Sequence, residues 1–204
     1  LLFVGKGDYG SFTNSASATD TRYAECMAAN VSAETGGRLI YENLSKTFTF
    51  QFPADFSVVG IEPGYGPNWS APATTTGMVL AQINVPQSFE PGTNFGNAWF
   101  TVGTSADPQA VADCTTNLEG KQATSTPVTI GGVNYTVLAF AGAGAGNRYD
   151  TTSYRTVKDN QCWAIEYTIH YGVFENYPKG SVQQFDEQKV VNALDQVVQS
   201  FRFQ

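Results

Sequence analysis

The sequence predicts an α+β fold in which an antiparallel β-sheet is flanked by helices and preceded by an extended N-terminal arm. Three observations lead to this expectation. Several short segments alternate apolar and polar residues, most clearly over residues 47–52. Two pairs of such segments are joined by residues that favour tight turns, Gly131-Gly132 and Asp159-Asn160. The segment from Glu187 to Phe201 carries apolar residues at helical spacing.

The composition describes one domain with an appendage. The chain has 204 residues and a net charge of -7. Only 14% of its residues are charged and 13% are aromatic, and this combination excludes an intrinsically disordered protein. The acidic balance and the scattered cations argue against binding to nucleic acid. No apolar run approaches the ~20 residues that a spanning helix needs, so we expect no transmembrane segment. We divide the chain into an arm, residues 1–37, and a domain, residues 38–204.

The first half of the chain begins with a segment rich in Ser, Thr, Ala and Gly, in which we expect one short helix over residues 21–29. Residues 47–52 place three phenylalanines on one face of a half-buried strand that Pro53 ends, and extended structure resumes over 56–59. A long loop over residues 60–77 follows. Its aromatic residues are expected either to contact a ligand or partner or to fold back over the core: Tyr65 and Trp69.

The second half continues with strands over residues 78–85 and 98–102. Asp107 is an expected N-cap with Pro108 at the first helical position, so a helix should start there. Residues 128–140 form a hairpin with a Gly-Gly turn. The segment 141–146 alternates Ala and Gly but lacks the spacing of a nucleotide-binding loop, so we expect a hairpin tip.

The last part of the chain is expected to form a second hairpin followed by the C-terminal helix. Strands over 148–158 and 162–171 are joined at Asp159-Asn160. In the second strand, alternate residues from Trp163 should share one face, and alternate residues from Cys162 the other. Asp186 should cap the C-terminal helix, which packs on the sheet, and a short extended tail ends the chain.

This order of elements resembles the PsbP-like fold over about residues 40–204. The residues that carry the resemblance are Phe48-Thr49-Phe50-Gln51-Phe52-Pro53, the Thr126-Pro127-Val128-Thr129-Ile130-Gly131-Gly132 hairpin and the closing segment 196–203. The segment Cys162-Trp163-Ala164-Ile165-Glu166-Tyr167-Thr168-Ile169-His170, followed by Phe185-Asp186 and Ser200-Phe201-Arg202-Phe203, is similar to uncharacterised exported bacterial proteins of that fold. The resemblance implies scaffolding or binding more often than catalysis.

Three cysteines in a chain rich in Ser, Thr and Asn favour an extracytoplasmic location, secreted or at the cell surface. Cys114 ends the stripe that should face the sheet, and Cys162 opens a strand on the face that carries Ala164, so we predict a disulfide between Cys114 and Cys162. The rival pairing joins Cys26 to Cys114. Cys26 is otherwise the odd thiol, and any anchoring signal is expected outside this sequence.

His170 is the only histidine, so a Ser-His-Asp or Cys-His site would need it. Glu166 shares its strand face but lies roughly 13 Å away along the strand. Asp150 or Tyr154 could approach His170 from the neighbouring strand. Because neither a nucleophile motif nor a metal-ligand spacing accompanies the histidine, we predict no catalytic residue, no metal and no cofactor.

The leading hypothesis is a non-enzymatic extracytoplasmic interaction or structural module, such as a subunit of a cell-surface assembly or fibre. Its arm would dock on a protein partner or on another copy, because the arm has apolar residues that it cannot bury by itself: Leu1, Leu2, Phe3 and Val4. The alternative is a carbohydrate- or peptide-binding module that uses Tyr65, Trp69 and the segment 94–99. A hydrolase that uses His170 is the third hypothesis.

Overall fold

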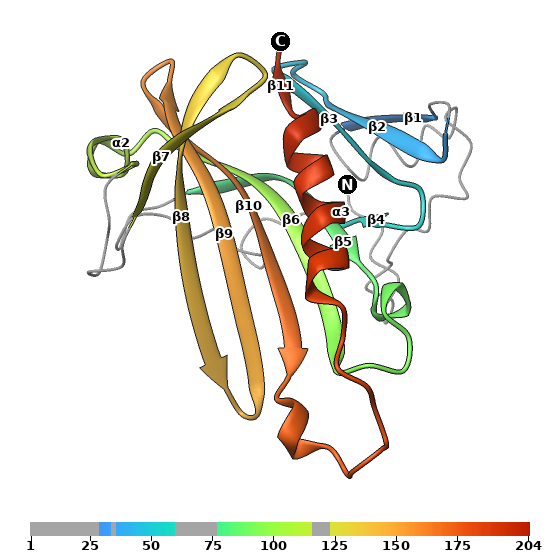
Figure 1. The fold of residues 1–204 in the computed structure, drawn as a ribbon. Helices are drawn as coiled ribbons and strands as arrows, with labels where there is room; N and C mark the ends of the chain where they lie inside the picture. Colours follow the sequence, from blue (N-terminus) through green and yellow to red (C-terminus); the bar gives the residue numbers. More distant parts are fainter. Residues whose placement is uncertain (1–28, 34–35, 60–76, 116–122) are drawn as a thin grey trace, which may run out of the picture.

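The computed structural model describes residues 29–33, 36–59, 77–115 and 123–204. Two antiparallel sheets and one long helix make up this part of the chain (Figure 1). None of the helices within these ranges combines the length and the apolar character needed to cross a membrane.

The smaller sheet has four strands in the order β1-β2-β3-β11. These are β1 (Ala29–Ala33), β2 (Arg38–Asn43), β3 (Phe48–Pro53) and β11 (Arg202–Phe203). The larger sheet has seven strands in the order β4-β5-β6-β10-β9-β8-β7. These are β4 (Ser57–Val58), β5 (Met78–Val85), β6 (Phe95–Ser105), β7 (Ala123–Ile130), β8 (Val133–Gly144), β9 (Asn147–Lys158) and β10 (Gln161–Gly172).

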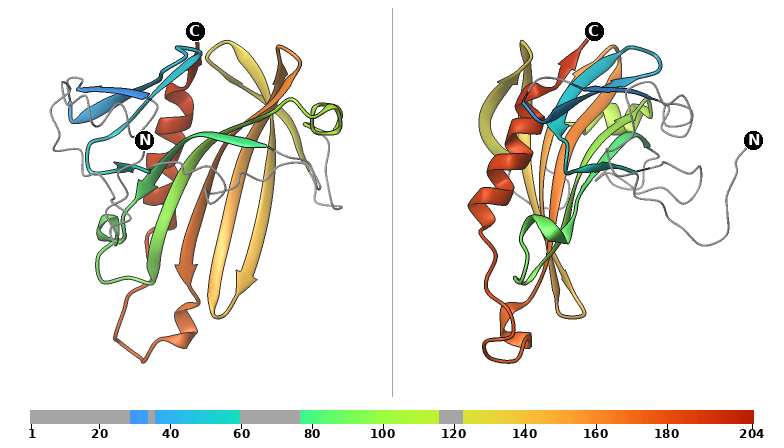
Figure 2. Two further views of the ribbon diagram at one scale, coloured as in Figure 1. Left: turned by 180° about the vertical axis from the view of Figure 1, so that it is seen from behind. Right: turned by 90° about the vertical axis from the view of Figure 1, so that its right-hand side faces the viewer.

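The part of the chain that the structure describes has few helices. Helix α3 (Glu187–Ser200) lies along one side of the larger sheet, as the edge-on view in Figure 2 shows. Helix α2 (Pro108–Ala112) has five residues, and the 3-10 helices η1 (Gln87–Phe89) and η2 (Phe174–Asn176) have three each. The expectation of a sheet flanked by helices was therefore overstated: α2 ends after about one turn, with only Ala110 buried, and cannot cover a sheet face.

Tight turns hold the predicted hairpins in register. Gly131 and Gly132 have φ angles of 58° and 81°, and Asp159 and Asn160 have φ angles of 52° and 56°. Two successive positive φ angles are typical of the primed turns that match strand twist. The β7–β8 and β9–β10 hairpins predicted from these residues are present. Of the Ala-Gly segment predicted as a tip, residues 141–144 end β8 and pair with β9, and Ala145 and Gly146 form the tip itself.

The small sheet extends beyond the predicted domain. Strand β1 lies within the predicted arm and pairs with β2 from Ala29↔Asn43 to Ala33↔Leu39. The predicted boundary at residue 37 thus falls between two paired strands. The short helix predicted over residues 21–29 lies outside the described residues except at its last position, which belongs to β1.

The core is built around the phenylalanine row of β3, which is Phe48, Phe50 and Phe52. All three side chains are fully buried. The Phe50 ring centroid lies 4.9 Å from that of Phe100 on β6, and the Phe48 centroid lies 5.5 Å from that of Phe201, which ends α3. The row therefore joins the smaller sheet to both the larger sheet and the helix.

Helix α3 begins where the sequence predicts. The Asp186 side chain accepts a hydrogen bond from the backbone N–H of Lys189 at 3.0 Å, as an N-cap does. Its buried residues recur at helical spacing and face the core: Val190, Leu194, Val197 and Val198. The short tail after the helix is β11, which pairs with β3 through Arg202↔Thr49 and Phe203↔Phe48.

A disulfide joins Cys114 to Cys162, with Cα atoms 5.4 Å apart. Both cysteines are fully buried, and they pack with Ala164 and Val79 at the end of the large sheet. The disulfide ties the segment after α2 to the start of β10. Cys26, the partner in the rival pairing, lies outside the described residues.

Replacing both Cys114 and Cys162 by Ala should lower the free energy of unfolding by roughly 2–4 kcal/mol, because the unfolded chain is no longer closed into a loop. Denaturant titration measures this effect. Reductant should destabilise the natural protein and leave the double variant unchanged. Equal unfolding midpoints for the oxidised natural protein and the double variant would contradict the prediction.

Candidate functional site

The two faces of the larger sheet differ in chemistry. Alternate residues of β10, from Trp163 to Tyr171, belong to the face that packs on α3 and the smaller sheet. The other face, here called the polar face, carries Glu166, Thr168 and His170 of β10 together with the residues paired to them on β6 and β9. This alternation confirms the two sets of β10 residues that the sequence predicted.

The middle of the polar face is a ladder of buried polar side chains. The Gln82 amide donates to the hydroxyl of Thr101 at 3.2 Å, and the hydroxyls of Thr151 and Thr168 lie 2.7 Å apart. The Arg155 guanidinium donates from Nε to Ser153 at 3.1 Å. Burial lowers the pKa of Arg155, and the nearby Glu166 carboxylate opposes that shift. Buried polar groups paired in this way specify the strand register.

His170 lies further along the same face, at the centre of a hydrogen-bonded row. Its Nδ1 is 2.9 Å from Oδ1 of Asn97, and its Nε2 is 3.0 Å from Oδ1 of Asn147. The Asn97 amide in turn donates to Oδ1 of Asn84 at 3.3 Å. The row crosses β5, β6, β10 and β9, and it fixes both the position and the plane of the imidazole ring.

Two aromatic rings flank this row. The Tyr149 ring stacks on His170, with centroids 4.7 Å apart and planes inclined by 9°. The centroid of Trp99 lies 6.5 Å from that of Tyr149. All three side chains are half-buried. A Cβ at Gly96 would lie 2.7 Å from Nδ1 of His170, so the close approach of the imidazole to β6 requires glycine there.

The structure does not bring the expected partners to His170. Asp150 and Tyr154 lie on the α3-facing side of β9, where Asp150 accepts from the Tyr171 hydroxyl at 2.7 Å and Tyr154 donates to Asp195 at 3.2 Å. Burial and the contact with Asp150 raise the pKa of Tyr171 to about 12. Among the residues with described positions, no three His, Cys, Asp or Glu side chains gather as a metal site would require.

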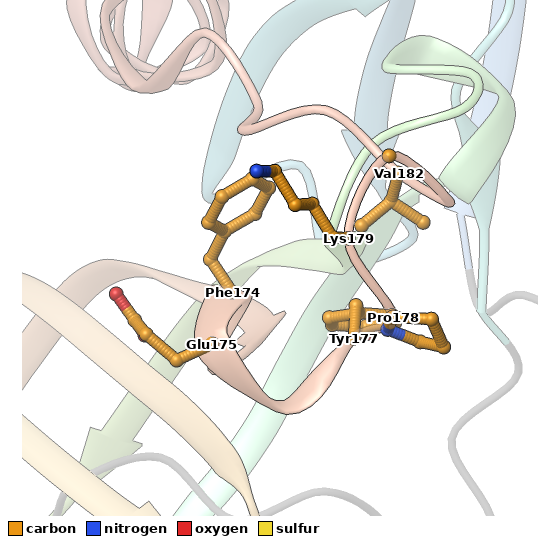
Figure 3. A pocket seen from close by; sticks show the side chains of 7 residues that line it. Phe174, Glu175, Tyr177, Pro178, Lys179 and Val182 are labelled. Atoms are coloured by element: carbon orange, nitrogen blue, oxygen red, sulfur yellow. The ribbon is translucent and has the colours of Figure 1, made fainter.

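A shallow pocket lies in the connection between β10 and α3. It has a volume of about 330 Å³ and is lined by Phe174, Glu175, Tyr177, Pro178, Lys179, Gly180 and Val182. Figure 3 shows that one loop supplies the whole lining and that Glu175 points away from Val182. Phe174 and Tyr177 are 40% and 38% exposed. The pocket therefore offers partly exposed aromatic contact area beside Glu175 and Lys179.

Asn94 connects the two ends of the loop between β10 and α3. Its amide nitrogen donates to the carbonyl of Gly172 at 2.7 Å, and its Oδ1 accepts from the backbone N–H of Phe185 at 3.0 Å. Asn94 is 3% exposed. The sequence placed Asn94 in a ligand-binding segment with Trp99, but the Asn94 amide is engaged by backbone groups. Asn97 and Trp99 of that segment lie on the half-exposed part of the polar face.

The other residues singled out from the sequence lie outside the described residues. These are Tyr65 and Trp69 of the long loop, Leu1, Leu2, Phe3 and Val4 of the arm, and Cys26. The row around His170 was not predicted. The only local signal for it was the Asp159-Asn160 turn, which sets Tyr149 opposite His170.

No protein-family model matches the chain, and no curated protein matches it. Three solved structures share low similarity with it. A protein from Bacteroides thetaiotaomicron VPI-5482 is 12% identical with a TM-score of 0.44, over 84% of this chain and 49% of that one, so the chain spans about half its length.

LpqN, which is involved in cell envelope biogenesis of Mycobacterium tuberculosis, is 13% identical with a TM-score of 0.39, over 92% of this chain and 98% of that one. TplEi, a T6SS immunity protein from Pseudomonas aeruginosa, is 11% identical with a TM-score of 0.32, over 86% and 72% of the two chains. Similarities this low establish no family, function or partner, and the PsbP-like resemblance stays a prediction.

The environment of His170 predicts a pH dependence of stability. Burial lowers the pKa of His170 below its ordinary value of 6.5. In the window below about pH 6.5 the unfolded chain therefore binds more protons than the folded one, and stability should fall as the pH decreases through this window. The variant His170→Gln should flatten that part of the curve, since the chain has one histidine.

Unfolding free energies across the window, with NMR titration of the imidazole, measure this effect. An NMR pKa above 6.5 would contradict the prediction, and so would an unchanged slope in His170→Gln.

Asn94→Ala should cost about 2–4 kcal/mol of stability, because it leaves a buried carbonyl and a buried N–H without their partners. Asn192→Ala, on the exposed side of α3, is the matched control and should change stability by less than about 0.5 kcal/mol. Chemical denaturation of both variants makes the comparison. Equal effects would show that the Asn94 contacts contribute nothing specific.

Proposed function

We propose that the chain is a non-enzymatic extracytoplasmic module that binds a protein partner by adding a strand at the edge of β1. The buried disulfide supports the location, because disulfides persist in oxidising compartments. The main support for the binding mode is that β1 is an edge strand in the part of the chain that the structure describes.

The described sheets present four edges, and three of them resist further pairing. Strands β4 and β11 have two residues each. Strand β7 contains Pro127, which lacks an N–H, and its register shifts between Thr124 and Val128. Strand β1 has five residues and contains neither proline nor a charged residue. Short strands, prolines, irregularities and charges are the usual protection of sheet edges, so β1 is the least protected edge.

The arm adds to this argument through its place in the sequence. Residues 1–28 lead directly into β1, so an apolar segment such as Leu1-Leu2-Phe3-Val4 is covalently attached to the proposed docking edge. A partner strand that pairs with β1 would satisfy backbone groups, and the arm would supply apolar contacts. A second copy of the chain could serve as the partner, as in the fibre predicted from the sequence.

The surroundings of His170 support a role without catalysis. Both ring nitrogens are engaged by asparagine side chains, and one ring face is stacked on Tyr149. A general base needs a ring nitrogen directed at a nucleophile or a substrate proton. The arrangement instead holds the imidazole as part of a surface.

Ser32→Lys should weaken partner binding by about tenfold or more, because a charge on the edge strand opposes strand addition. Ser32 is exposed, so the folded chain tolerates Lys there. Thr129→Lys adds the same charge to the exposed side of β7 and is the matched control. Sedimentation measures self-association, and cross-linking to envelope proteins measures binding to other partners.

Loss of an interaction in Ser32→Lys, with retention in Thr129→Lys, would support the proposal. The absence of both self-association and cross-linked partners for the natural chain would contradict it, as would equal effects of the two variants. A chain that starts at Ala29 keeps β1 and removes the arm, so it separates the contribution of the arm from that of the edge.

A further inference from the structure

We propose that the polar face binds a neutral oligosaccharide at an aromatic-amide patch made of Asn84, Asn97, Trp99, Tyr149 and His170. The patch comprises the row around His170 and the two rings that flank it. It lies on the larger sheet, whereas the proposed docking edge is β1 of the smaller sheet. A negative result for one of these sites therefore does not contradict the proposal for the other.

The aromatic residues supply the surface for a sugar ring. One side of a pyranose presents mainly C–H groups, which pack on the apolar face of tryptophan or tyrosine. Trp99 and Tyr149 come from different strands, with centroids 6.5 Å apart, and both are half-buried. A half-buried ring has a fixed position and still exposes part of its surface, as a ligand-binding aromatic side chain should.

The asparagines supply matching polar groups. Each side-chain amide has two N–H donors and an oxygen with two acceptor positions. The row uses one Asn97 donor toward Asn84 and the Asn97 oxygen toward His170. The remaining capacity of these amides suits sugar hydroxyls, which both donate and accept hydrogen bonds.

The charge distribution selects a neutral ligand. On the polar face, the paired residues of β9 and β10 at and next to the patch carry no carboxylate, ammonium or guanidinium group: Tyr149, Thr151, Thr168 and His170. Asp150 and Arg148 alternate to the opposite face. The nearest charged residue on the same face of β10 is Glu166, four residues from His170. An anionic polysaccharide would find no cation on these strands at the patch.

The patch is also organised before a ligand arrives. The imidazole is held at both nitrogens and stacked on Tyr149, and Gly96 leaves the space that its close approach requires. Groups that are already fixed lose little entropy on binding, which improves affinity.

The test uses the full chain with four neutral probes and one charged probe. Cellohexaose, laminarihexaose, chitohexaose and mannohexaose are titrated by calorimetry, with polygalacturonate as the anionic comparison. We expect at least one neutral probe to bind in the micromolar to millimolar range and polygalacturonate to bind more weakly. Failure of all four neutral probes to bind would overturn the proposal, and so would preferential binding of polygalacturonate.

Two variants then locate the site. Trp99→Ala should weaken binding by about tenfold or more, and Asn84→Ala by about three- to tenfold. Phe174→Ala removes an aromatic residue that is 40% exposed elsewhere, and it should leave the affinity within about twofold. If Trp99→Ala does not fold, Asn84→Ala and Trp99→Phe decide the question. Unchanged affinity in the folded variants of the patch would overturn the assignment.

Discussion

The phenylalanine row of β3 is the constraint on which the rest of the structure depends. Phe48, Phe50 and Phe52 point to one side because strand side chains alternate with a period of two, and a register slip of one residue would turn all three outward. The same row contacts the larger sheet through Phe100 and the end of α3 through Phe201. The register of a six-residue strand thereby sets how two sheets and a helix meet. The pairing of β11 with β3 then locks the C-terminal segment against the same strand.

The fold was predictable where local chemistry decides it. Strands β3 and β5, the two hairpins with positive-φ turns and the capped helix α3 all have signals within a few residues of themselves. Strand β1 has no such signal, since its extended structure depends on a partner that lies elsewhere in the sequence. The extended tail that forms β11 was predicted, but its pairing with β3 has no local signal. The second flanking helix was overestimated because Asp107 and Pro108 predict a helix start, whereas nothing in that pattern fixes its length.

The candidate site was only partly predictable, and the reason is again the range of the contacts. A two-residue turn at Asp159-Asn160 fixes the register of β9 and β10, so the position of Tyr149 opposite His170 could have been read from the sequence, although Asp150 and Tyr154 were named instead. The pairing of β10 with β6 has no local signature, because it joins residues far apart in the sequence, such as His170 with Asn97 and Thr168 with Trp99. Asn97 and Trp99 therefore could not be placed beside His170. Asparagines also form no catalytic motif, so no sequence signature marks Asn84, Asn97 or Asn147.

The two faces of β10 contribute differently to the fold. The face toward α3 buries aromatic and aliphatic side chains in the main core, and its loss would unfold the domain. The polar face changes character along the strand, from the disulfide at Cys162, through buried polar pairs at Glu166 and Thr168, to the half-exposed ring of His170. The covalent link and the paired polar groups hold the strand at one end and in its middle. The other end contributes little to the core and holds its rings and amides in fixed positions through the contacts of His170. Fixed positions of this kind are what the proposed oligosaccharide site requires.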